Sequence, residues 1–243
     1  MGRFFSAIRF ITILPVGAPE TFTPQGMAPY FPLVGLLLGA ILAGCDLLFT
    51  AIWSLPVASI LDGVVLIILT GAFHLDGLSD TADGLLSHRS KERMLEIMKD
   101  SRIGAMGMIV TVAVLAVKWA GIMELTRCRP LFLFVIPAYS RGSMLFAMKY
   151  LPYGRPEKGL GRDLVNDPMG ISWFRFLAVP VAISLLCGVW GVVLNLFFAV
   201  LVLLIVFYYR RKLGCVTGDM LGAMTETTEA FLFLLAAAGG GTS

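Results

Sequence analysis

Long apolar stretches dominate the chain, and short groups of Gly, Pro or charged residues separate them. A helix needs about 20 apolar residues to cross a bilayer, so stretches of this length predict membrane-spanning helices. Seven spans are predicted, near residues 30–50, 55–74, 104–123, 131–150, 174–189, 191–209 and 219–238. Little more than Gly188 to Gly191 separates the fifth span from the sixth, which predicts a tight helical hairpin.

Composition agrees with this pattern. The chain is 58% hydrophobic and only 14% charged, and its mean hydropathy is +0.85. These values exclude an ordinary soluble globular domain. We therefore expect an all-α fold, a polytopic helical bundle that forms one membrane-embedded domain over residues 1–243. The lipid bilayer is its expected surroundings, nucleic acid is not an expected partner, and self-association into a homo-oligomer stays open.

The first residues, MGRFFSAIRFITILPV, combine a basic start with an apolar run. Arg9 interrupts this run and Pro15 ends it, so the apolar part is too short for a secretion signal. We expect an N-terminal amphipathic or re-entrant helix ahead of the first span.

Lys and Arg are distributed unevenly between the predicted loops. If the N-terminus is cytoplasmic, the loops 75–103, 151–173 and 210–218 lie on that side with most of the nineteen Lys and Arg. Only Arg127 and Arg129 then fall in an external loop. This asymmetry follows the positive-inside rule.

The first of two acidic clusters lies within residues 74–102. Asp76, Asp80 and Asp83 recur at i, i+4 and i+7, so on a helix they project from one face. A solvated helix face is the ordinary alternative for such a run. These charges, however, have one sign and adjoin an apolar span, where carboxylates repel each other and are costly to desolvate unless cations lie between them.

The second cluster, residues 218–229, carries Asp219, Glu226 and Glu229 at i, i+7 and i+10, again one stripe of a helix. Mg²⁺ prefers oxygen ligands and is commonly completed by substrate phosphates, so two facing stripes predict one or two Mg²⁺ ions across a diphosphate. The candidate metal ligands are Asp76, Asp80, Asp83, Asp100, Asp219, Glu226 and Glu229.

Other polar residues near the clusters are candidates for catalysis. His74 is a candidate general base or orienting group, with a structural histidine at a span end as the alternative. Arg102 is a candidate phosphate clamp. Arg141 lies within a span, where a guanidinium indicates either function or an internal ion pair. The candidate catalytic set is His74, Asp80, Asp83, Arg102 and Arg141.

A loop rich in Gly and cations, RPEKGLGRD at residues 155–163, suits binding of an anionic substrate. Two further cations, Arg89 and Lys99, lie within residues 74–102, the segment of the first acidic cluster. The candidate substrate-binding residues are Arg89, Lys99, Arg155, Lys158 and Arg162.

Five segments carry a resemblance: FITILPV (10–16), HLDGLSDTADGL (74–85), EIMKDSRIGAMG (96–107), RPEKGLG (155–161) and TGDMLGAMTE (217–226). In this order they resemble the adenosylcobinamide-GDP ribazoletransferase family, also called cobalamin synthase. The resemblance implies a Mg²⁺-dependent membrane enzyme that expels GMP from adenosylcobinamide-GDP while attaching α-ribazole or its 5′-phosphate. We expect the cytoplasmic (inner) membrane of a bacterium or archaeon, with the active site facing the cytoplasm.

Two alternatives remain. Residues 80–84, DTADG, match the opening of the CDP-alcohol phosphotransferase signature of phospholipid synthesis, which continues to an Ala-Arg pair where this chain has Ser87-His88. A cation transporter is the alternative of another class, because carboxylates in membrane helices also mark ion pathways. Transport predicts acidic residues at mid-depth in several spans, whereas these residues gather at predicted span ends.

Overall fold

The computed structural model describes residues 2–17, 22, 26–155 and 170–239. In this part of the chain the elements are helices, and the only β-type pairing is an isolated bridge between Tyr153 and Val216. Their order is α1 (Gly2–Ile11), η2 (Ala28–Tyr30), α2 (Phe31–Ile52), α3 (Leu55–Thr70), α4 (Phe73–Leu85), α5 (Lys91–Ile97), α6 (Ala105–Met123), α7 (Arg129–Tyr150), η3 (Ile171–Leu177), α9 (Ala178–Ser184), η4 (Leu185–Cys187), α10 (Val189–Lys212) and α11 (Gly218–Ala238).

The polytopic helical fold is confirmed, but seven spans is too many. Among the described residues, five helices are long and apolar enough to cross a membrane, and a sixth candidate is a bent pair made of α3 and α4. The five are Ala28–Ile52, Ala105–Met123, Arg129–Tyr150, Val189–Lys212 and Gly218–Ala238.

The bend between α3 and α4 overturns the expected span at 55–74 and the expected loop at 75–103. Gly71 and Ala72 both adopt left-handed backbone conformations, each with φ of 59°, and the two helices meet there at 91°. Asp76, Asp80 and Asp83 therefore lie on a helix that packs against α6 and α11, not in a loop.

The expected span at 174–189 is not one regular α-helix, because η3, α9 and η4 divide it, and the apolar segment Ile171–Cys187 is shorter than the five long helices. The hairpin with α10 is confirmed. Gly188 makes the turn with a φ of 65°, and the Asn195 side-chain amide donates to the Ser184 hydroxyl at 3.0 Å across it.

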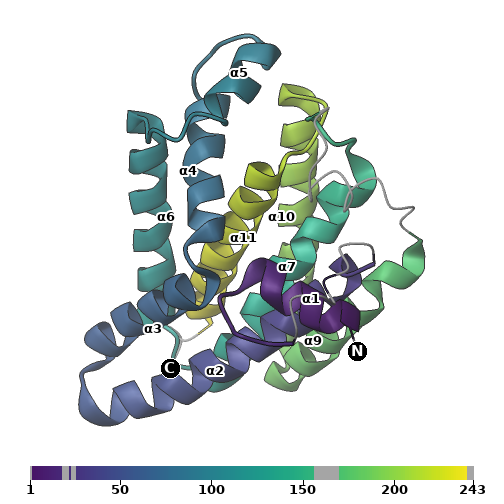
Figure 1. Cartoon of the computed structure of the whole chain (residues 1–243). Helices are drawn as coiled ribbons and strands as arrows, with labels where there is room; N and C mark the ends of the chain where they lie inside the picture. Colours follow the sequence, from purple (N-terminus) through teal and green to yellow (C-terminus); the bar gives the residue numbers. More distant parts are fainter. Residues whose placement is uncertain (1, 18–21, 23–25, 156–169, 240–243) are drawn as a thin grey trace.

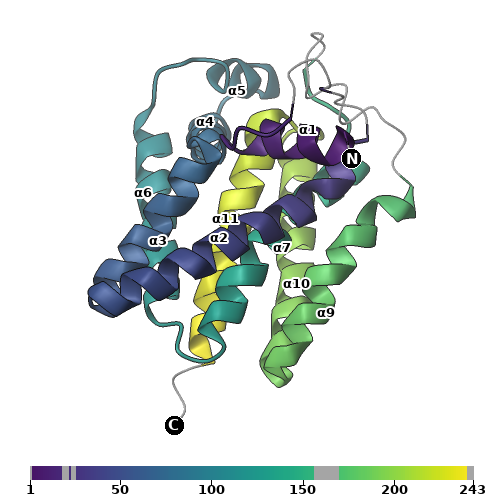
Figure 2. The ribbon, with the colours of Figure 1, turned by 60° about the horizontal axis from the view of Figure 1, so that its bottom comes forward.

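Helix α11 lies in the middle of the bundle, in contact with α4, α6, α7 and α10 (Figure 1). Helix α2 packs along α7, and α1 lies across one end of the bundle against α2 (Figure 2). Ser6, Ala7, Ile8 and Ile11 form the buried face of α1, while Arg3 is exposed, which confirms the expected amphipathic helix.

The α2–α7 contact depends on two glycines of α2, Gly35 and Gly39, and Gly39 makes the closer approach to the backbone of α7. A Cβ atom on Gly39 would overlap the carbonyl oxygen of Phe134, whereas Gly44 in the same helix has nothing within 4 Å. We expect Gly39→Ala to force the helices apart and to cost about 1–3 kcal/mol of unfolding free energy. Gly44→Ala should be neutral or stabilising by up to ~1 kcal/mol, since alanine favours helix. Thermal unfolding of the purified variants tests this, and equal midpoints for the pair would contradict it.

Candidate active site

Part of the first acidic cluster, on α4, meets Asp219 of the second where α4 packs against the first turns of α11 (Figure 1). A Cβ atom on Gly77 would lie 2.7 Å from the carbonyl oxygen of Asp219, so the two backbones touch there. One turn along each helix, a Cβ on Gly222 would lie 3.1 Å from the carbonyl oxygen of His74. Because small residues let helix backbones approach closely, these glycines bring Asp219 beside the acidic face of α4.

Asp80 stands among like charges. The carboxylates of Asp76, Asp219 and Asp83 all act electrostatically on Asp80, and the guanidinium of Arg155 acts with the opposite sign. Asp76 is exposed, whereas Asp80 and Asp219 are half-buried. Carboxylates that interact in this way repel one another unless cations neutralise them. We call Asp76, Asp80 and Asp219 the acidic site.

Arg155 supplies a cation to this site. Its guanidinium forms an ion pair with Asp219 and donates to the carbonyl oxygen of Met98 at 3.3 Å. The isolated bridge places it there: the Gly154 N–H donates to the Val216 carbonyl oxygen at 2.9 Å. The structure thus brings one of the expected substrate-binding residues onto one of the expected metal ligands.

Asp83, expected as a metal ligand and catalytic residue, has a different set of contacts. Its carboxylate accepts the N–H of Gly104 at 2.7 Å and the N–H of Gly107 at 2.8 Å. Both N–H groups lie at the start of α6, where backbone N–H groups have no acceptor within the helix. The negative charge of Asp83 is also favourable at a helix N-terminus. A Cβ on either glycine would overlap the Asp83 carboxylate. Asp83 therefore fixes α6 to α4.

Asp100 and Arg102 pair with each other on the surface that follows α5. The Arg102 guanidinium donates to Asp100 at 2.6 Å, and this hydrogen bond lowers the pKa of Asp100 to about 2. The Arg102 side chain is 87% exposed. Together with Asp83 the pair lines an open cavity of about 360 Å³. The structure places Asp100 at this cavity rather than in the acidic site.

Glu226 and Glu229 lie in a buried network of charges. Lys118 Nζ, from α6, donates to Glu226 at 2.5 Å and to Glu229 at 2.8 Å. Arg141, from α7, pairs with Glu229, and the Ser140 hydroxyl donates to Glu229 at 2.9 Å. All four charged side chains are at least 96% buried.

In this network three candidate site residues have other contacts than the expected ones. Glu226 and Glu229 contact cations rather than an open metal site, and Arg141 forms the internal ion pair that was the alternative to a phosphate contact. The reason is helix rise: at 1.5 Å per residue, Glu226 lies about 10 Å and Glu229 about 15 Å beyond Asp219 along α11. Carboxylates on one stripe can therefore belong to different sites.

His74 also belongs to the interior of the bundle. Its side chain is buried, and neither ring nitrogen has a hydrogen-bond partner among the described residues. Its charged neighbours are Arg141, Glu226 and Lys118. This position matches the structural alternative better than a general base that exchanges protons with substrate at the acidic site.

A second buried network at the far end of α7 was not predicted. Arg129 pairs with Asp46 at 2.6 Å and with Asp62 at 3.2 Å, and donates to the Ser59 hydroxyl at 3.3 Å. These residues join α2, α3 and α7. The sequence carries a signal for this network, because a charged residue within an apolar span needs a partner. Asp46 in α2 and Lys118 in α6 are such residues.

The remaining expected substrate-binding residues lie on the segments next to α5 or outside the described part of the chain. Arg89 and Lys99 are exposed, on the segments that flank α5. Lys158 and Arg162 lie outside the described residues.

The acidic site is not a preformed metal centre. Within the described residues, no group of three or more His, Cys, Asp or Glu side chains is arranged to hold a metal ion. Its chemistry nevertheless fits Mg²⁺, which takes oxygen ligands and commonly uses one or two carboxylates, completing its shell with water and substrate phosphates. The residues therefore fit an ion that binds together with a phosphate ligand.

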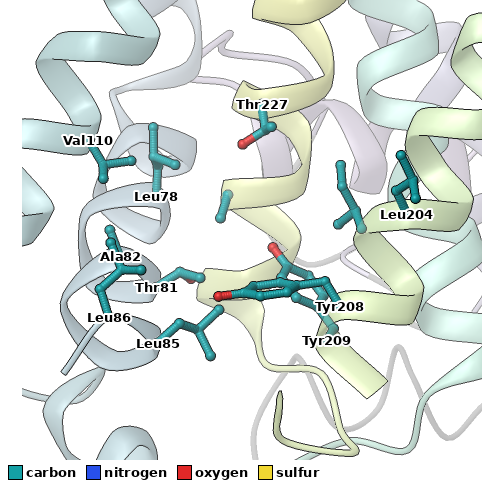
Figure 3. Close-up of a pocket in the computed structure, with 12 residues that line it drawn as sticks. Leu78, Thr81, Ala82, Leu85, Leu86, Val110, Leu204, Tyr208, Tyr209 and Thr227 are labelled. Carbon is teal, nitrogen blue, oxygen red and sulfur yellow. The ribbon is translucent and has the colours of Figure 1, made fainter. Parts of the chain in front are cut away.

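An apolar cavity of about 300 Å³ lies between α4, α6, α10 and α11 (Figure 3). From α4 it is lined by Leu78, Thr81, Ala82 and Leu85. By helical periodicity these residues lie on the side of α4 opposite its Asp residues. A cavity of about 370 Å³ between α4 and α6 includes Asp76 and so adjoins the acidic site.

Comparison with known proteins identifies relatives over nearly the whole chain. Residues 3–237 match the family model described as Cobalamin-5-phosphate synthase. An adenosylcobinamide-GDP ribazoletransferase of Klebsiella pneumoniae (strain 342) is 40% identical over 242 residues, covering 96% of this chain and 98% of the relative. The protein of the same name from Desulforamulus reducens is 38% identical over 233 residues, covering 94% and 93%. That of Geotalea daltonii is 33% identical over 246 residues, covering 98% of each. No solved structure gives a significant match.

Proposed function

We propose, since the chain belongs to the cobalamin-5-phosphate synthase family, that it is an adenosylcobinamide-GDP ribazoletransferase of cobalamin biosynthesis. The proposed reaction joins adenosylcobinamide-GDP to α-ribazole, or to its 5′-phosphate, and releases GMP. The observation that carries the proposal is the acidic site at the α4–α11 crossing, with Arg155 beside it. A cluster of carboxylates with an adjacent guanidinium suits a ligand that combines phosphate with a divalent cation.

In this reaction the 3′-hydroxyl of the ribose attacks the phosphorus that bears cobinamide. A new P–O bond forms as the P–O bond to GMP breaks, and GMP leaves with the electron pair of that bond. The hydroxyl proton passes to a carboxylate of the acidic site. Arg155 would orient the diphosphate through its planar fork of N–H donors, and alignment of the reacting atoms supplies much of the rate.

Mg²⁺ is the proposed cofactor, as one ion or two. Asp76, Asp80 and Asp219 would hold it. When bound, it supplies positive charge against the diphosphate and the departing GMP. Asp83 supports the site indirectly by holding the start of α6 against α4.

The proposed location is the cytoplasmic (inner) membrane of a bacterium or archaeon, with the acidic site facing the cytoplasm. The basic residues of α1, α5 and the end of α10 support this orientation through the positive-inside rule. Nucleotide substrates and Mg²⁺ are available on that side.

We expect the purified protein, reconstituted in liposomes, to release GMP from adenosylcobinamide-GDP only when α-ribazole or its 5′-phosphate and Mg²⁺ are both present. A chelator should stop release and added Mg²⁺ should restore it, because the carboxylates alone repel a diphosphate. Chromatographic measurement of GMP and the corrinoid product tests this. Absence of GMP release under these conditions would contradict the proposal.

Matched assays separate the two alternatives. CDP-diacylglycerol with an alcohol acceptor should yield no CMP, whereas a phospholipid synthase would release it. Proteoliposomes without organophosphate should show no Mg²⁺ flux, whereas a cation transporter would carry the ion.

A further inference from the structure

Toward the described residues, Arg155 uses only part of its hydrogen-bonding capacity. A guanidinium carries five N–H donors in a fixed fork. The described contacts are the ion pair with Asp219 and the hydrogen bond to the Met98 carbonyl oxygen. Its Nε is buried without a hydrogen-bond partner in the part of the chain that the structure describes. A buried charged donor without a partner is costly, so a further ligand would stabilise this side chain.

The backbone that leads to Arg155 is held without help from its side chain. The Gly154 N–H donates to the Val216 carbonyl oxygen, and the Val216 N–H donates to the Pro152 carbonyl oxygen, each at 2.9 Å. Asp219 is positioned separately by the start of α11, where the Thr217 hydroxyl caps the helix by accepting the Met220 N–H. The guanidinium can therefore leave Asp219 while both backbones stay in place.

We propose that Arg155 exchanges partners when ligands bind. In the ligand-free protein it neutralises Asp219, and a divalent cation that arrives with a diphosphate takes its place while the guanidinium turns to a phosphate oxygen. This inference rests on the proposed function, because it takes Asp219 as a metal-binding carboxylate and a diphosphate as the ligand.

Charge explains the exchange. A guanidinium and a divalent cation on one carboxylate repel each other, so Arg155 opposes metal binding as long as it holds Asp219. A diphosphate reverses this relation, because its oxygens accept both the metal and the guanidinium fork. Coupling between two ligands is reciprocal. The metal therefore releases Arg155 for the substrate, and the substrate stabilises the metal.

Removal of the guanidinium should thus have opposite effects on the two ligands. We expect Arg155→Gln to bind Mg²⁺ alone at least about fivefold more tightly, within the range of ordinary coupling between sites. The same variant should raise the KM for adenosylcobinamide-GDP by at least about tenfold, because a charged contact to phosphate is lost. A purely structural role for Arg155 would weaken both interactions.

The metal measurement uses the purified full-length protein without substrate, by following its thermal unfolding midpoint during titration with MgCl₂. A ligand that binds only the folded state raises the midpoint with concentration. The control is Arg93→Gln, which removes an exposed arginine paired with Glu96 and should leave the titration unchanged. Arg155→Lys keeps the charge but not the fork, so its Mg²⁺ response should stay near that of the unaltered protein while its KM rises.

Unchanged or weaker Mg²⁺ binding in Arg155→Gln overturns the exchange. If Arg155→Gln does not fold, Arg155→Lys serves as the test. Its retained charge should still oppose the metal, so Mg²⁺ binding at least fivefold tighter than in the unaltered protein would overturn the exchange. Asp219→Asn separates this failure from that of the proposed function. If Asp219→Asn loses the Mg²⁺ response but Arg155→Gln does not tighten it, only the exchange is wrong. If Asp219→Asn keeps the full response, the proposed metal site itself is wrong.

Discussion

Replacing Asp219 with Asn is expected to lower the rate of GMP release by about 10²–10³-fold, comparable to the loss of one preorganised charge-stabilising group. Asn keeps the size of the side chain and one carbonyl oxygen but loses the negative charge that holds a cation. Asp80→Asn should have a similar effect, because Asp80 faces the same group of charges. Steady-state GMP release at saturating Mg²⁺ measures the loss.

Two other variants show whether this loss is specific. Glu96→Gln removes an exposed carboxylate that pairs with Arg93 and should leave both turnover and the unfolding midpoint unchanged. Asp83→Asn should instead lower stability by about 0.5–2 kcal/mol, the usual range for loss of a helix cap, because Asp83 holds the start of α6. Full turnover of both Asp219→Asn and Asp80→Asn would remove the acidic site from the reaction.

Lys118→Met is expected to destabilise the protein by about 3–5 kcal/mol, because it leaves two buried carboxylates with a single cation. Lys118 contacts Glu226 and Glu229 in the interior of the bundle. In Lys118→Met, Arg141 still pairs with Glu229, but Glu226 loses the cation that it contacts. Adding Glu226→Gln to Lys118→Met restores a neutral pair, so the double variant should be more stable than Lys118→Met alone. Thermal unfolding of the purified proteins measures the two effects and their coupling.

Lys91→Met is the matched control, because it removes a lysine from an exposed position and should change the midpoint little. A midpoint for Lys118→Met equal to that of the unaltered protein would contradict the network. The network would also be contradicted if the stability lost by the Lys118→Met/Glu226→Gln double variant equalled the sum of the losses of the two single variants, because the residues would then act independently.

The sequence predicts most of the long helices because hydropathy is a local property. The runs near 30–50, 104–123, 131–150, 191–209 and 219–238 each became one helix with ends a few residues away. It failed at 55–74, where the apolar run continues but the chain turns by 91°. A single glycine in an apolar run does not predict such a turn, because glycine is also common within membrane helices.

For the acidic site, the sequence indicated the residues but not which of them lie together. It indicated Asp76, Asp80 and Asp219, and the crossing of α4 and α11 brings them together through contacts at Gly77 and Gly222. The same periodicity grouped Glu229 with Asp219, although the rise of the helix separates them by about 15 Å. Periodicity describes the face of a helix, whereas a site also depends on depth along that helix and on the neighbouring elements.

What the sequence determined by itself is a membrane-embedded helical bundle with two clusters of carboxylates, because composition and spacing decide both. Only the tertiary structure decided which charges face a ligand and which neutralise each other. Lys118 and Glu229 are 111 residues apart in the chain and 2.8 Å apart in the bundle, while Asp219 pairs with Arg155 at the surface end of the same helix. Such pairs depend on which helices pack together, and a buried charge is stable only beside the partner that this packing supplies.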